Sequence, residues 1–244
     1  SLLGVGNSLY PSPLVNELLD DPQHAEELVN ALEEAGYEAM AAGTAGLSAP
    51  TTTTLGFLRA ARAAGFPVIA TNLSCGEDVE NTAACENGAA GLVSPHAIVQ
   101  RGELTLGVVA ALPAALESGI SSGAMAGATI APPPAAIRRT IQQLREAGAD
   151  VIVLLSHLDS DRTAPRQTLE LLGALEGEDR PDLVLASNTA GVVEHMRAPG
   201  GGPQIFAIQG AAYGRVVLEG GDTGWSVRES SSIALPGDSD PQTS

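Results

Sequence analysis

Small polar residues follow several apolar, strand-like segments, at the positions where α/β proteins place their ligands. A hydrolase that uses two divalent cations needs several carboxylates and imidazoles at one point, to hold the metals and to form hydroxide at neutral pH. These loops carry mostly Gly, Ala, Ser, Thr and Asn, with one histidine, so they argue against dinuclear hydrolysis. In chain order they are Gly6-Asn7, Ala42-Gly43-Thr44-Ala45-Gly46, Asn72, Ser156-His157 and Ser187-Asn188-Thr189-Ala190.

His157 permits two interpretations, because it ends a wholly apolar segment. We favour a hydrogen-bonded histidine around which the loop packs. The alternative is a metal ligand, because hard cations accept nearby carboxylates such as Asp159, Asp161 or Asp182. That alternative predicts a mononuclear site with one divalent cation, manganese or zinc, near His157 and Asp159.

Cys75 and Cys85 are the only two cysteines and lie in a polar, loop-like stretch. We expect a local disulfide, which the chain-entropy treatment values at about 2 to 3 kcal/mol. A pair of free thiols is the alternative, whereas a zinc site lacks a CxxC pattern or a flanking histidine. A disulfide favours an exported location, periplasmic or at the surface of a bacterium. Asn72-Leu73-Ser74 also fits a glycosylation sequon.

The composition is that of an acidic, folded chain. Hydrophobic residues make up 44% of its 244 residues, and we expect one domain over residues 1–235 with a flexible acidic tail at 236–244. The 29 acidic residues outnumber 12 basic ones, and the net charge of −17 disfavours nucleic acid as a partner. No apolar run reaches the roughly 18 to 20 residues of a membrane span. A lipid or membrane tether upstream of Ser1 stays an open alternative.

Helices and strands are predicted to alternate, which is typical of a sheet covered by helices. Apolar residues at helical spacing predict helices over 22–36, 54–64, 134–148 and 165–175. Apolar runs predict strands over 2–5, 37–42, 66–71, 151–155, 183–186, 204–209 and 215–219, and an antiparallel pair over 97–99 and 104–111. Residues 112–134 lack a period and predict a long surface excursion, either an interaction element or a disordered loop.

Six blocks of sequence, in order over nearly the whole chain, together carry a family resemblance. They are ELVNALEEAGYEAMAAGTAG, GFPVIATNLS, SPHAIVQRGELTLGVVAAL, AAIRRTIQQLREAGADVIVLLSHL, PDLVLASNTAGVV and PQIFAIQGAAYGRVVLE. The set resembles the calcineurin-like metallophosphoesterases, in particular the catalytic domain of bacterial 5′-nucleotidases and their thiosulfohydrolase relatives. The resemblance implies an α/β fold, a metallophosphoesterase-like sandwich of two mixed β-sheets flanked by helices.

The chain departs from the family at nearly every metal ligand. The Gly-Asp position of active members falls on Gly6-Asn7, and the Asn-His of their GNHE motif falls on Thr44 and Ala45. The histidines of their GH-x-H motif fall on Asn188 and Ala190. Of the usual ligands His157 is retained, and we expect the family's Asp-x-His strand to lie upstream of Ser1. We also expect no counterpart within these 244 residues of the family's C-terminal domain, which holds the aromatic clamp for the base.

We therefore expect a catalytically inactive domain, a pseudoenzyme without a cofactor, that is a structural or binding subunit of an exported protein assembly. Other protein subunits are then its partners. One alternative is a hydrolase of phosphoesters, nucleotides or sulfur esters with a mononuclear metal near His157. Another is small-ligand binding in the former active-site cleft, where neutral side chains would supply hydrogen bonds: Asn7, Thr44, Asn72, Asn188 and Thr189.

Overall fold

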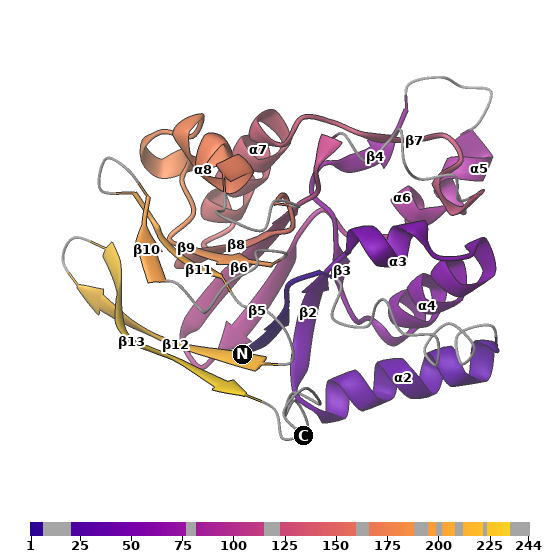
Figure 1. The fold of residues 1–244 in the computed structure, drawn as a ribbon, viewed down its shortest axis with the longest axis horizontal. Coiled ribbons are helices and arrows are strands. Elements are labelled where there is room, and N and C mark those ends of the chain that lie inside the picture. The colour runs from indigo at the N-terminus through magenta and orange to yellow at the C-terminus, as the bar shows by residue number, and fades with distance from the viewer. Residues whose placement is uncertain are drawn as a thin grey trace, which may run out of the picture.

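The computed structural model describes residues 1–6, 21–76, 82–114, 123–159, 166–187, 195–198, 202–207, 212–221 and 224–234. Five residues named above lie outside these ranges: Asn7, Asp161, Asn188, Thr189 and Ala190. Figure 1 shows the order of the elements.

The smaller sheet has three parallel strands, β1 (Leu2–Gly4), β2 (Tyr37–Ala41) and β3 (Val68–Ile69), in the order β1-β2-β3. Helices α2 (Pro22–Glu34) and α4 (Thr51–Ala64) cover one of its faces (Figure 1). The Asp21 side chain begins α2 by accepting a hydrogen bond from Gln23 N at 2.9 Å. Gly65 ends α4 in the left-handed conformation, with φ of 78°. Helices and strands thus alternate in this part of the chain, as the periodicity of its apolar residues predicted.

The larger sheet has six strands in the order β10-β11-β9-β8-β6-β5. Its four inner strands run parallel, and the two edge strands pair antiparallel to them. Helices α7 (Pro133–Glu146) and α8 (Arg166–Gly173) cover its outer face. All six residues of β8 are buried, because both faces of this central strand are covered. The strands are β5 (Ala97–Arg101), β6 (Leu104–Ala111), β8 (Val151–Ser156), β9 (Leu183–Ala186), β10 (His195–Arg197) and β11 (Gln204–Ala207).

The two sheets share one apolar layer, in which Ala39, Ala41 and Ile69 of the smaller sheet pack with residues of the larger one such as Val153 and Leu155. The predicted α/β sandwich flanked by helices is therefore confirmed. The larger sheet is mixed as expected, while the three described strands of the smaller sheet are all parallel. Within the described residues, no helix is long and apolar enough to cross a membrane.

A C-terminal hairpin, β12 (Ala212–Gly221) and β13 (Gly224–Ala234), closes the layer from below in Figure 1. Val216, Leu218 and Val227 pack against the sheets, and the Trp225 indole donates a hydrogen bond to the Asp150 carbonyl oxygen at 2.9 Å. The apolar run over 215–219 predicted part of β12, whereas no pattern predicted β13. The run GWSVRESSSIA is mostly polar, so it lacks the apolar signal of a strand.

The predicted excursion over 112–134 is wrong for the residues that the structure describes. Leu112 and Ala124 are buried, η3 spans Gly123–Met125, and α7 begins at Pro133. Strand β7 (Ala128–Ile130) pairs antiparallel with β4 (Leu73–Cys75). Two three-residue strands far apart in sequence are too short to show a period. Three short helices were missed for the same reason: α3 (Thr44–Ser48), α5 (Thr82–Glu86) and α6 (Ala89–Leu92).

Candidate functional site

The carboxyl ends of four strands meet around His157. The residue follows β8, and its backbone N–H donates to the Ala111 carbonyl at the end of β6, at 3.0 Å. Its ring reaches Thr44, which follows β2, and Ser187, which follows β9. β6, β8 and β9 are neighbouring parallel strands of the larger sheet, and β2 belongs to the smaller sheet that packs against it, so the site lies where the carboxyl ends of strands from both sheets meet.

Both ring nitrogens of His157 are engaged by hydroxyl groups. Nε2 lies 3.1 Å from Thr44 Oγ1, and Nδ1 lies 2.5 Å from Ser187 Oγ. The residue is 1% exposed, and this burial lowers its pKa from 6.5 to about 4. At neutral pH the imidazole is therefore uncharged, with one nitrogen donating and the other accepting. The favoured interpretation of a hydrogen-bonded, packed histidine describes this geometry.

Gly6, which follows β1, lies directly against the His157 ring. A Cβ at this position would come within 2.8 Å of His157 Cγ, and the backbone there has φ of 71°. Glycine meets both requirements, since it has no Cβ and adopts positive φ without strain. The loop after β1 thus forms part of the wall that excludes water from His157.

Asp159 lies near His157 in sequence, but its carboxylate binds the start of helix α8. It is 1% exposed, and its carboxylate accepts hydrogen bonds from Gln167 N at 2.7 Å and from Thr168 Oγ1 at 2.6 Å. It also accepts from Thr168 N at 3.2 Å, so it caps the amino end of α8. The Ser156 hydroxyl completes this buried group, 2.6 Å from Thr168 Oγ1.

Asn72 joins the segments that follow β3, β6 and β7. Its side-chain NH₂ donates to the carbonyls of Leu112 at 2.7 Å and Ala131 at 2.8 Å, and its oxygen accepts from Leu112 N at 2.9 Å. The residue is 2% exposed. Its amide is therefore used to hold backbone together, and in the folded chain it is accessible neither to a ligand nor to a glycosylating enzyme.

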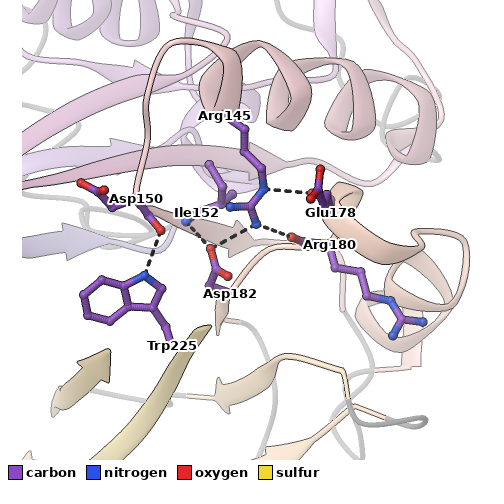
Figure 2. A network of polar contacts seen from close by, with 7 residues as sticks. All are labelled: Arg145, Asp150, Ile152, Glu178, Arg180, Asp182 and Trp225. Atoms are coloured by element: carbon purple, nitrogen blue, oxygen red, sulfur yellow. Dashed lines mark hydrogen bonds and ion pairs between the residues drawn. The ribbon is translucent and has the colours of Figure 1, made fainter. Parts of the chain in front are cut away.

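Asp182 belongs to the opposite end of the larger sheet. Its Oδ2 accepts from Ile152 N at the start of β8, at 2.7 Å, and from Arg145 Nη2 at 3.2 Å (Figure 2). Arg145 also donates to the carbonyls of Glu178 and Arg180, which fixes the segment before β9 against α7. A metal site that combines Asp182 with His157 is therefore wrong. This Arg145 network could not be predicted from the sequence, in which Arg145 is only a basic residue near the end of a helix.

Cys75 at the end of β4 and Cys85 in α5 lie at disulfide distance, with their Cα atoms 5.7 Å apart. The local pairing expected from the sequence is therefore supported.

The described donors do not fit a pair of divalent cations. Thr44 brings a neutral hydroxyl and Ala45 a methyl group to the loop after β2. Both nitrogens of His157 and both oxygens of Asp159 already have partners. No group of three or more His, Cys, Asp or Glu side chains that could hold a metal occurs in the described part of the chain.

Comparisons with known proteins identify the fold. No protein-family model and no curated protein matches the sequence. A solved calcineurin-like phosphoesterase from Bacillus subtilis matches with a TM-score of 0.66 and 16% identity, over 95% of this chain and 75% of its own. A 5′-nucleotidase precursor from Thermus thermophilus matches with a TM-score of 0.68 and 17% identity, over 96% of this chain and 44% of its own.

The sulfate thiohydrolase SoxB from Thermus thermophilus is similar to the same degree, with a TM-score of 0.67 and 18% identity. The match covers 96% of this chain and 38% of that one, so this chain spans less than half of both Thermus proteins. The predicted resemblance to calcineurin-like phosphoesterases and 5′-nucleotidases is thus confirmed as a likeness of fold. Sequence identities this low support a shared fold and not a shared activity.

Proposed function

We propose that this chain is a catalytically inactive domain of metallophosphoesterase-like fold that serves as a structural or binding subunit of an exported protein assembly. The observation that carries the proposal is the Thr44–His157–Ser187 group, in which neutral hydroxyls occupy both nitrogens of the buried imidazole. An imidazole in this state is a structural link and not a free ligand.

The absence of hydrolysis follows from charge. Two divalent cations in one site need anionic ligands, both to offset their mutual repulsion and to stabilise bound hydroxide. The positions that resemble the family's ligands hold Asn7, Thr44, Ala45, Asn188 and Ala190, all of them uncharged. The remaining position, His157, would have to give up the hydrogen bond at the nitrogen that coordinates, and its buried ring would have to become accessible, before it could bind a cation.

Export and assembly are supported by two further features. A disulfide between Cys75 and Cys85 persists in oxidising compartments such as the bacterial periplasm or the cell surface. The net charge of −17 keeps such a domain apart from other acidic molecules and favours protein partners that present positive charge. The domain would then contribute a folded surface and no reaction centre.

Metal content and hydrolysis, measured on the same preparation, test the proposal. The full chain is purified without a His tag or chelators, loaded with manganese and zinc, dialysed, and analysed by elemental mass spectrometry. Hydrolysis of p-nitrophenyl phosphate and AMP is then assayed with and without each metal. We expect substoichiometric metal, no turnover above background, and the same two results for His157→Gln.

One tightly held cation per chain, with turnover that His157→Gln abolishes, would overturn the proposal in favour of a mononuclear hydrolase. Binding of a small molecule in the former cleft would appear instead as ligand-dependent thermal stabilisation without metal. Asn72 cannot contribute to such binding, because three backbone hydrogen bonds already occupy its amide.

A further inference from the structure

We propose that reduction of the Cys75–Cys85 disulfide releases helix α5 while the rest of the domain stays folded. The proposal concerns a different part of the molecule from the His157 site and holds whether or not the chain is an enzyme. It begins from the size of α5. A five-residue helix is too short to be stable by itself, so tertiary contacts must hold it in place.

Two contacts do so: Cys85 is buried, and the backbone of Glu86 lies against Gly91 of α6, where there is no room for a Cβ. Ala83, Ala84 and Glu86 are exposed, whereas Cys85 is 1% exposed. Cys85 is thus the single buried side chain among the α5 residues whose burial is described, and its sulfur is the one bonded to Cys75. Hydrogen bonds at the end of α5 are local to this segment; for example, Asn87 Nδ2 donates to the Ala83 carbonyl at 2.8 Å. Figure 1 shows α5 at the periphery, beside β4 and α6.

The structure on either side of α5 is held independently of the disulfide. Upstream, Gly76 N donates to the Gly127 carbonyl at 3.0 Å and continues the β4–β7 pairing, which Leu73 and Ile130 anchor in the core. Downstream, Gly88 fits closely against η3, since a Cβ there would come within 2.8 Å of the Ala124 carbonyl. Opening the disulfide should therefore free α5 and leave the structure at Gly76 and at Gly88 in place.

The reaction is an ordinary thiol–disulfide exchange with a dithiol. Cys75 is partly exposed, so a reductant thiolate can attack its sulfur, break the S–S bond and release Cys85 as a thiolate. The second thiol of the reductant then attacks the mixed disulfide and releases Cys75. Two electrons pass to the protein, which gains two thiols on protonation, and the reductant leaves as its own disulfide. An oxidising compartment thus keeps α5 in place, and a reducing one exposes it.

Limited proteolysis of the full chain with a protease that cleaves after glutamate tests the proposal, because Glu86 is exposed within α5. Wild type is treated with dithiothreitol, thiol alkylation and mass measurement establish that both cysteines are reduced, and cleavage after Glu86 is timed. We expect reduction to speed this cleavage at least about tenfold, with the circular dichroism unchanged. The double variant Cys75→Ser/Cys85→Ser should match reduced wild type without reductant.

Cleavage after Glu27 in α2 is the internal control, because that exposed site lies far from the disulfide in sequence. Its rate should not change on reduction. The proposal is overturned if cleavage after Glu86 is no faster in the reduced protein, or if both sites accelerate together, which would mean that the whole domain unfolds. It is equally overturned if dithiothreitol cannot reduce the pair while the protein is folded.

Discussion

Acidification should destabilise the protein through His157, by an amount that the structure fixes. Burial lowers the pKa of His157 in the folded chain to about 4, against the ordinary value of 6.5 for a histidine exposed to water. Between these two values the unfolded chain binds a proton that the folded chain does not. The contribution of His157 to the free energy of unfolding is therefore highest above pH 6.5, falls as the pH drops toward 4, and is level again below that.

The size of the loss follows from the difference between the two pKa values. The two pKa values differ by about 2.5, and each pKa unit corresponds to about 1.4 kcal/mol, so the full loss is between about 3 and 4 kcal/mol. About 3 kcal/mol of it is lost by pH 4, where half of the folded protein has bound the proton. The comparison with His157→Gln isolates this contribution, since the glutamine does not titrate and the 29 acidic residues are common to both chains. Urea unfolding followed by circular dichroism at half-unit steps from pH 7.5 to 4 measures both. We expect the advantage of wild type over the variant to shrink by about 3 kcal/mol; an advantage that is constant with pH refutes the reasoning.

Three substitutions test the remaining structural contacts by urea unfolding at pH 7.5. Asn72→Ala leaves three backbone groups unpaired and should cost about 3 kcal/mol, while the exposed Asn30→Ala should cost less than about 0.5 kcal/mol; equal effects contradict the clamp. Asp159→Ala removes the cap of α8 and should cost about 1 to 3 kcal/mol, and a neutral result would mean that the carboxylate is not needed there. Trp225→Phe keeps an aromatic ring, although a smaller one, but loses the donor to the Asp150 carbonyl and should cost about 1 kcal/mol; a loss beyond about 3 kcal/mol would show that ring packing dominates.

The elements with a regular pattern could be predicted from the sequence, because periodicity reports burial directly. The apolar run over 151–155 and the amphipathic run over 134–148 correspond to β8 and α7 within a few residues. The meeting of Thr44 and His157 depends in addition on how the two sheets pack, because Thr44 follows a strand of the smaller sheet and His157 a strand of the larger one. Strand β7 could not be predicted in this way, because its pairing with β4 depends on contacts distant in sequence.

The roles of the polar residues were harder to predict, because a side chain's partner is set by the fold. Asp159 caps a helix that begins seven residues later, whereas the usual capping signal adjoins the helix. Asn72 looks like a ligand group in sequence and is a clamp between three backbone segments in the structure. In both cases the residue type indicated a polar role, but the hydrogen-bond partners could not be predicted from the sequence.

The most direct test of the central claim is the ¹⁵N spectrum of the His157 ring, recorded on the full chain with and without excess zinc. The account predicts a neutral imidazole at pH 7.5, with one protonated and one unprotonated nitrogen, and no change in either shift when zinc is added. A zinc-dependent shift of either His157 nitrogen, saturating at one metal per chain, would show that the residue is a ligand and would contradict the account.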